Sequence, residues 1–455
     1  MIRKKIKLES LIIQYFIGLA ICVLLVIILL STNITYKNLQ IPEGDYKENL
    51  WKGSDVITYV QPARNFISTG TFEFENYISP YQRTIGYPFF LSILMRLFGG
   101  NWLIWAYFMQ ATIIAFIFPA ISKISYIIFP DKKPIALAAF VFFILAGTYW
   151  TMTPALLTDA FFTTFFTVGL CFGLLSIIKQ NWKYLILYLL FVGYAAQIRP
   201  TLLYYAIVNI LILAAIAKQY NILNKLKVKK IIVISSIALL ILCNIPSMRN
   251  YIIYGFFKPT TVLNHNLFNI LGNNVLTDKG EVELYKTMER ETEKINNIKD
   301  IIEHLALKQK YAFEIYKKYP LNTTKQMLKR AAVIMGESHF TLVANYWGYD
   351  WMDKTESTWA ILKKSNFVVA FNIIYGLINI FIYITFLSFL IRLLKSKKYL
   401  FAFAIMFYVA YFMFPTFIAG GGFRNRLIVE GMIVIFAFYE IGYNWKFLRA
   451  GKKHT

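Results

Sequence analysis

Residues 11–30 read LIIQYFIGLAICVLLVIILL, a run of twenty predominantly apolar residues without a charged side chain. An α-helix of this length spans the hydrocarbon core of a bilayer. No small-residue cleavage site follows the run, so we interpret it as a retained first membrane span rather than as a signal peptide.

Similar apolar runs recur along the chain, which has 455 residues, is 58% hydrophobic and has a mean hydropathy of +0.52. A soluble domain of this size could not bury so much apolar surface. We therefore predict an all-α polytopic membrane protein. Its expected spans number about ten and lie at 10–31, 101–129, 135–152, 154–178, 183–198, 201–218, 231–254, 366–394, 399–418 and 426–445.

The net charge of +24 lies in short basic clusters between the apolar runs. This pattern is typical of cytoplasmic loops and argues against a nucleic-acid partner. With ten spans all the clusters fall on one side, so we expect a multi-pass plasma-membrane protein with both termini in the cytoplasm. The clusters are Arg3 to Lys5, Lys132-Lys133, Lys179 with Lys183, Lys225 to Lys230, Lys395 to Lys398 and Lys446 to Lys453.

The predicted topology gives the opposite, extracytoplasmic side two long loops. Nineteen of the 24 Asp and Glu side chains lie in these loops, so carboxylate chemistry is expected there. The parts of the chain are the N-terminus with the first span (1–31), the first loop (32–100), a transmembrane bundle (101–254), the second loop (255–365) and the C-terminal spans with a short cytoplasmic tail (366–455).

Both loops are predicted to carry juxtamembrane helices. Residues 53–69 have an apolar pattern broken by Pro62, which indicates a kinked helix on the membrane surface. Residues 281–318 have an amphipathic pattern that ends at Pro320, and a further short helix is expected over 321–335.

Charged residues at the ends of spans or inside them are costly, which makes each of them a candidate for function. Asp159, Arg199 and Arg249 are all predicted near the extracytoplasmic ends of their spans. Because the three residues are expected at the same depth in the membrane, they predict a polar cavity at the outer leaflet. Arg249 could instead reach lipid headgroups.

The last span adds more charges at the same predicted level. Arg424 and Arg426 open it, and Glu430 follows Arg426 by four residues on the same helical face. Arg426 and Glu430 could equally form a simple intrahelical pair. Lys123 and Glu440 fall near the cytoplasmic boundary, where we expect their side chains to extend toward water.

The strongest local signal is residues 53–90, GSDVITYVQPARNFISTGTFEFENYISPYQRTIGYPFF. Asp55 and Tyr59 are followed by a Gly70 turn, then Arg83, and then Gly86-Tyr87-Pro88 opening a new helix. This order resembles the first extracytoplasmic loop of GT-C glycosyltransferases. It is similar to the bacterial branch (glycosyltransferase family 39-like) related to protein O-mannosyltransferases and lipid A aminoarabinose transferases. The first Pro of that family's Pro-Gly-Tyr-Pro is missing here.

Further resemblances follow in the family's order over most of the chain. In the last of them Asn425 replaces an aromatic residue, and many relatives also carry a large soluble C-terminal domain. The matching segments are Thr158-Asp159, Ile198-Arg199-Pro200, Met248-Arg249-Asn250, Tyr319-Pro320 and Arg424-Asn425-Arg426.

The resemblance implies a GT-C-type helix bundle that moves a sugar, with inversion, from a polyprenyl-phosphate donor to a glycan, lipid or protein acceptor. It places Asp55 at the position of the general base, and Asp159 is a candidate second carboxylate. Tyr59, Tyr87 and Glu430 are candidates for lining the cavity. The candidates for binding the donor phosphate are Arg83, Arg199, Arg249, Arg424 and Arg426.

Several alternatives stay open at this point. Asp55 could be the N-cap of the surface helix. A divalent cation is used by some members of the family, and Asp55, Asp159 and His265 could supply ligands for one. A polysaccharide polymerase or ligase would use similar chemistry. A flippase or transporter of lipid-linked sugars would favour internal repeats and broken spans, and the sequence contains neither.

Overall fold

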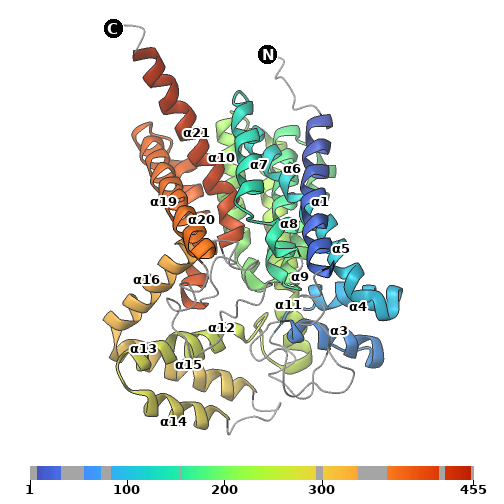
Figure 1. Cartoon of the computed structure of the whole chain (residues 1–455), viewed down its shortest axis with the longest axis vertical. Helices are drawn as coiled ribbons and strands as arrows, with labels where there is room; N and C mark the ends of the chain where they lie inside the picture. The colour runs from blue at the N-terminus through green and yellow to red at the C-terminus, as the bar shows by residue number, and fades with distance from the viewer. Residues whose placement is uncertain are drawn as a thin grey trace.

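The computed structural model describes residues 8–31, 56–72, 83–153, 156–293, 301–336, 366–419 and 426–451. All regular elements in these ranges are helices, so the all-α prediction is confirmed for them. Figure 1 shows a bundle of long helices in which α1 (Leu8–Ser31) begins, and α21 (Leu427–Gly451) ends, at the same end. The helices α3 (Ile57–Thr69) and α12 to α16 lie at the opposite end.

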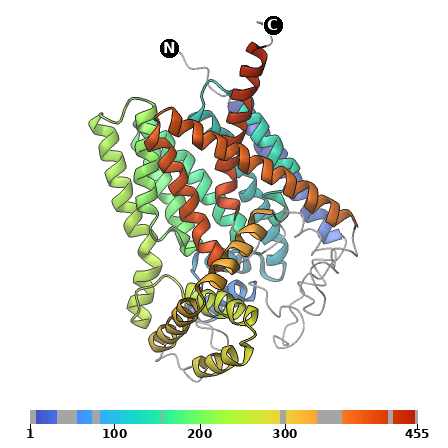
Figure 2. The ribbon, with the colours of Figure 1, turned by 90° about the vertical axis from the view of Figure 1, so that its left-hand side faces the viewer.

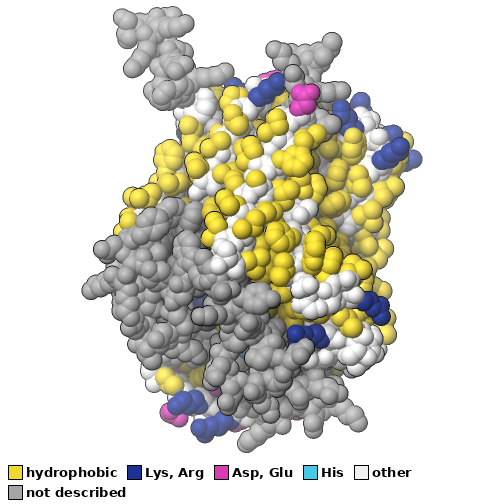
Figure 3. Space-filling view, turned by 45° about the vertical axis from the view of Figure 1, so that its right-hand side comes forward, with side chains coloured by type: hydrophobic (Ala, Val, Ile, Leu, Met, Phe, Trp, Pro, Cys, Tyr) yellow, Lys and Arg dark blue, Asp and Glu magenta, His cyan; other side chains and the backbone are white. Residues whose placement is uncertain are grey.

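Among the described residues, seven helical stretches are long and apolar enough to cross a membrane, and the chain is therefore a helical membrane protein. They are Glu9–Ile28, Gly86–Ile128, Lys133–Met152, Thr158–Lys179, Leu226–Tyr254, Ile373–Lys395 and Leu427–Asn444. Three shorter apolar helices are Trp182–Ile198, Tyr205–Gln219 and Tyr399–Pro415. Figure 3 shows hydrophobic side chains over a broad surface of the bundle, with Lys and Arg near its edges.

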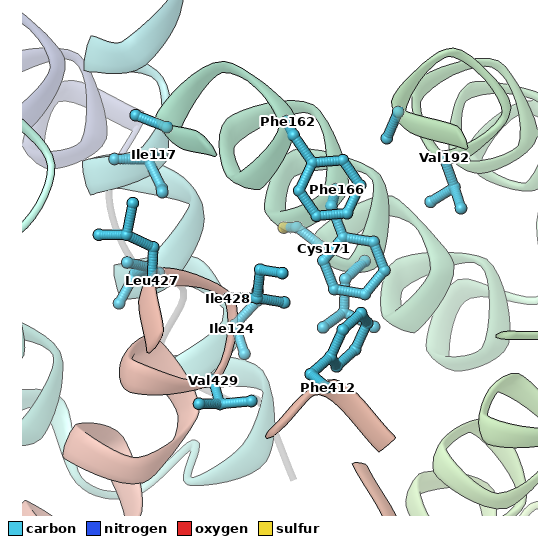
Figure 4. Packing of buried hydrophobic residues seen from close by; sticks show 14 of the residues in the cluster. Ile117, Ile124, Phe162, Phe166, Cys171, Val192, Phe412, Leu427, Ile428 and Val429 are labelled. Atoms are coloured by element: carbon cyan, nitrogen blue, oxygen red, sulfur yellow. The ribbon is translucent and has the colours of Figure 1, made fainter. Parts of the chain in front are cut away.

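The bundle is held by a hydrophobic core that joins helices distant in sequence. In Figure 4, Ile124, Phe166, Phe412 and Ile428 gather from four different helices. The rings of Phe166 and Phe412 have centroids 5.2 Å apart. The bundle helices besides α1 and α21 are α4 (Gly86–Phe98), α5 (Trp102–Ala115), α6 (Ile117–Ile128), α7 (Lys133–Leu145), α8 (Thr158–Lys179), α9 (Trp182–Ile198), α10 (Tyr205–Gln219), α11 (Leu226–Tyr254), α19 (Asn366–Lys395) and α20 (Tyr399–Ala419).

Neighbouring bundle helices are held together by a close approach at a glycine and by hydrogen bonds between polar side chains. At Gly169 of α8, a Cβ atom would lie 2.6 Å from the Val192 side chain of α9, so only glycine permits this close approach. Asn209 of α10 accepts a 2.7 Å hydrogen bond from the Tyr188 hydroxyl and donates at 2.9 Å to Ser235 and Ser236 of α11. Interhelical hydrogen bonds of this kind supplement van der Waals packing in membrane bundles.

Residues 262–293 and 301–336 form a helical layer at the end of the bundle opposite to the start of α1 (Figures 1 and 2). The layer has its own small core, which includes Phe268, Leu271 and Ile315. Arg330 connects the layer to the bundle, because it donates to the carbonyl oxygens of Ile270 (3.0 Å) and Ile418. The layer contains α12 (Val262–His265), the π-helix η4 (Asn266–Gly272), α13 (Asn273–Asp278), α14 (Val282–Glu293), α15 (Ile301–Lys318) and α16 (Pro320–Gly336).

The helices predicted in the two loops are largely confirmed. The surface helix is α3, which contains Pro62 and ends at Gly70 in the left-handed region with φ of 77°. The pattern over 281–318 forms two helices, α14 and α15, while residues 294–300 lie outside the described ranges. The helix after them begins at Pro320 as expected.

Two expectations need correction. The fourth span begins at Thr158 rather than at residue 154, because Leu157 is still extended, so Asp159 lies in the first turn of α8. Glu440 does not extend toward water. Its side chain is buried and paired with Arg392 of α19 at 2.7 Å, because α19 and α21 pack side by side.

Candidate functional site

The first loop is joined to the bundle at the start of α4. The Thr84 hydroxyl donates a 2.6 Å hydrogen bond to the carbonyl oxygen of Ile198, the last residue of α9. Gly86 makes this contact possible, since a Cβ there would lie 2.6 Å from the carbonyl oxygen of Gln197. The backbone around Arg83 is therefore held against the end of α9.

Asp159 and Arg199 form an ion pair at the same place. Asp159 lies in the first turn of α8, where the positive end of the helix dipole favours a carboxylate. Arg199 follows α9 in an extended conformation that points the chain toward α8. The side chains are 8% and 22% exposed, so the pair is sheltered while its arginine remains partly accessible.

Arg83 lies beside this pair and is half-buried. Its Nε donates to the Thr58 hydroxyl of α3 at 3.0 Å, and its guanidinium carbon lies 5.1 Å from the centroid of the Tyr59 ring. The Tyr59 hydroxyl is 3.2 Å from that of Thr158, the residue before Asp159. We call Thr58, Tyr59, Arg83, Asp159 and Arg199 the Asp159 cluster.

Tyr87 supports this cluster from within the core. Its ring packs edge-on against Tyr59, with centroids 5.4 Å apart, and it is fully buried. Its hydroxyl donates to Gln110 at 2.7 Å, and Gln110 donates in turn to the carbonyl oxygen of Thr153 at 2.9 Å. These bonds fix the orientation of Tyr87, and through it that of Tyr59.

The helical layer contributes positive charge near Arg83. The pKa of His265 in α12 is lowered to about 4, first by burial and then by the positive charges of Lys308, Arg83 and His304. A group surrounded in this way resists taking up another proton. The positively charged side chains among these causes, Lys308 and Arg83, favour an anion nearby, whereas the burial does not.

A second polar cluster contains Arg426 and lies elsewhere in the bundle. Arg426 is fully buried and pairs with Glu430 at 3.2 Å, which confirms the intrahelical pair considered from the sequence. Its Nη1 also donates to the carbonyl oxygens of Ile334 (2.6 Å) and Met335 (2.7 Å) in α16. Tyr375 of α19 donates to Glu430 at 3.0 Å.

We call Tyr375, Arg426 and Glu430 the Arg426 cluster. Thr148 adds a hydrogen bond to Glu430 at 3.3 Å. The cluster therefore ties the ends of α16, α19 and α21 to the segment after α7. Its guanidinium nitrogens are engaged by protein oxygens on several sides, whereas Arg83 and Arg199 in the Asp159 cluster are partly exposed.

The remaining predicted residues fall into two groups. Arg249 is half-buried near the end of α11 and donates to Asn250 at 3.3 Å. Asp55 and Arg424 lie outside the described residues. The structure therefore brings together Tyr59, Tyr87, Arg83, Asp159 and Arg199 of the predicted set, and it places Arg426 with Glu430 in a separate cluster.

Of the residues considered as ligands for a divalent cation, Asp159 and His265 are described, while Asp55 lies outside the described residues. The described residues contain no group of three or more His, Cys, Asp or Glu side chains arranged to hold a metal ion. The Asp159 carboxylate is engaged by a guanidinium, which would compete with a cation for the same oxygen atoms.

Sequence reasoning did not identify Thr58, Thr84 and Gln110, which position the cluster through contacts between distant segments. The only available signal was that Gln110 is a polar residue within an apolar run. Comparison with protein-family models and with curated proteins finds no match for this chain.

Proposed function

We propose that this protein is an integral membrane glycosyltransferase that takes a sugar from a polyprenyl-phosphate carrier and works at the Asp159 cluster. The observation that carries the proposal is the position of Arg83 and Arg199. Both guanidinium groups are partly exposed beside a sheltered carboxylate, at the end of a membrane bundle covered by amphipathic helices.

The orientation is part of the proposal. If the three shorter apolar helices also cross the membrane, the seven candidate spans become the ten expected from the sequence. Lysines between consecutive spans then lie at the end where α1 begins, and the positive-inside rule assigns that end to the cytoplasm. The Asp159 cluster would accordingly act on the extracytoplasmic face.

The chemistry requires a base and a stabilised leaving group. An acceptor hydroxyl attacks the anomeric carbon, the bond from that carbon to the phosphate oxygen breaks, and the lipid phosphate leaves. Asp55, by resemblance the general base, would take the acceptor's proton. Arg83 and Arg199 would hold the phosphate, since a planar guanidinium donates two parallel hydrogen bonds to its oxygen atoms.

Asp159 would act on the arginines rather than on the sugar. Its ion pair with Arg199 fixes the direction of that guanidinium and partly offsets its charge before a donor binds. Positive charge around His265 would add long-range attraction for the phosphate. Arg426 would have a structural role in this proposal, because its donors are occupied by Glu430 and by α16 carbonyl oxygens.

The test is a transfer assay in proteoliposomes that contain the full chain. Radiolabelled polyprenyl-phosphate mannose, glucose and aminoarabinose serve as donors, and a bacterial membrane extract supplies acceptors. We expect label in a new covalent product, and a loss of about 100-fold to 10,000-fold in Asp55→Asn, the range for removing a general base.

Asp45→Asn is the matched control, because it removes a carboxylate from the same predicted loop and should leave transfer unchanged. Full transfer in Asp55→Asn would contradict the assignment of the base. Label that crosses the bilayer unchanged, with no new product, would contradict the enzyme and favour a transporter.

A further inference from the structure

A pocket of about 300 Å³ lies between the ends of several bundle helices, away from the Asp159 cluster. Arg199 lies just before α10, whereas the pocket is lined by Lys218 and Gln219 at the far end of that helix. The turn between α19 and α20 contributes Lys397 and Lys398. The pocket is therefore at the opposite membrane face and is separate from the proposed catalytic site.

The charged side chains that line this pocket are all cationic: Lys218, Arg392, Lys397 and Lys398. A neighbouring hollow of about 250 Å³ shares Phe129 and Tyr439 with the pocket and adds Asp131 and Lys132. The carboxylate of Glu440 is already paired with the lining residue Arg392. The pocket thus has an excess of positive charge. We call it the basic pocket.

Arg392 has an unused donor at this place. Its Nε donates to Glu440 at 2.7 Å, and its guanidinium carbon lies 4.3 Å from the centroid of Tyr443 and 5.1 Å from that of Tyr439. These contacts hold the guanidinium in one orientation. Its Nη2 is buried without a hydrogen-bond partner among the described residues. A buried N–H of a charged group that lacks a partner is costly, so the positive charge of Arg392 at the pocket is only partly offset by Glu440.

Apart from Gln219, the rest of the lining is apolar or aromatic. It includes Phe389, Leu393, Leu400 and Phe401, and a small apolar hollow that shares Phe401 continues between the helices. A soluble anion gains nothing from such walls, whereas a phospholipid offers a phosphate to the cations and apolar carbon to the rings. Basic pockets between membrane helices suit anionic lipid headgroups for this reason.

We infer that the basic pocket binds the phosphate group of an anionic phospholipid. Arg392, Lys218, Lys397 and Lys398, which line the pocket, surround the phosphate with positive charge. This site is independent of the proposed glycosyl transfer, because it lies at the other membrane face and shares no residue with the Asp159 cluster.

The experiment is native mass spectrometry of the detergent-purified full chain with phosphatidylglycerol, with phosphatidylcholine and with millimolar inorganic phosphate. We expect phosphatidylglycerol to remain bound in preference to phosphatidylcholine, and free phosphate not to displace it. In the double variant K397Q/K398Q the affinity for phosphatidylglycerol should fall by about fivefold for each lysine removed, given the usual contribution of one basic residue near a membrane surface.

The double variant K229Q/K230Q on α11 is the matched control, because it removes two exposed lysines from the same predicted face outside the pocket. Its affinity should equal that of the unmodified chain. If both double variants lose the same affinity for phosphatidylglycerol, the lipid is attracted by the general surface charge, and the proposed site is wrong. Equal retention of the two lipids, or displacement by free phosphate, would overturn it as well.

Discussion

The Asp159 cluster and the Arg426 cluster each contain an ion pair between an arginine and a carboxylate, yet the two pairs differ in their exposure to solvent. Arg199 is 22% exposed in its pair with Asp159, whereas Arg426 is completely buried in its pair with Glu430. The first pair joins two different helices, and the second joins two turns of one helix.

The difference in exposure distinguishes an arginine that stabilises the packing of helices from an arginine that can contact a ligand. A guanidinium saturated by protein oxygens, as in Arg426, contributes to specificity of packing and has few donors left for a ligand. A guanidinium that is only half-buried, as in Arg83, remains partly accessible to a ligand. The resemblance alone gives the two arginines the same role, and their burial distinguishes them.

The largest effect is expected from breaking the Arg426 cluster. Arg426→Met leaves Glu430 buried without its cation, which typically destabilises a protein by about 3–5 kcal/mol. Thermal unfolding in detergent, followed by size-exclusion chromatography, should show a large loss of stability. The double variant R426M/E430M should recover part of it, because no charge is then left unpaired. An unchanged unfolding temperature in Arg426→Met would contradict the structural role.

In the Asp159 cluster the main effect should be on activity. Arg83→Gln should lower transfer by about 100-fold to 1,000-fold, the usual result of removing one donor to a developing negative charge. The fold should survive, because Arg83 is only half-buried and Gln is itself polar. Arg96→Gln on the exposed face of α4 is the control and should transfer normally. Equal activity of the two variants would remove Arg83 from the site.

Gly86→Ala tests how the Asp159 cluster is positioned. The added Cβ would lie 2.6 Å from the backbone of Gln197, so the start of α4 must move away from α9. Overpacking of this kind costs about 1–3 kcal/mol. We expect a moderate loss of stability together with a loss of transfer. Gly442→Ala, where a Cβ meets open space, should change neither.

The smallest effect concerns pH. The pKa of His265 falls from 6.5 to about 4 on folding, so between these values the unfolded chain binds a proton that the folded chain does not. Stability should therefore be full above pH 6.5 and decrease as the pH falls toward 4. His265→Gln should flatten this part of the profile and match the unmodified chain at pH 7.5. If stability decreases with falling pH just as steeply in His265→Gln, another titrating group causes the decrease.

Local patterns explain what could be predicted from the sequence. The spans follow from runs such as residues 11–30, and the loop helices follow from amphipathic periodicity and from Pro320. Such signals depend on neighbours along the chain, and the helices they predict are present in the structure, with α8 beginning four residues later than expected.

Pairing between helices could not be predicted in the same way. Arg199 and Asp159 meet because α8 and α9 pack closely at Gly169, and Glu440 meets Arg392 because α19 lies against α21. Each pairing depends on which helices become neighbours, and a single sequence does not contain that information. The basic pocket went unrecognised for the same reason, because its lysines come from separate turns.

The most direct test of the central claim is photo-crosslinking with a polyprenyl phosphate that carries a diazirine beside the phosphate, followed by peptide mapping. The account predicts labelling of residues 56–72 and 83–98 and of the segments around Asp159 and Arg199, with strong loss in Arg83→Gln and none in Arg96→Gln. Labelling confined to the α19–α20 turn, or unaffected by Arg83→Gln, would contradict it.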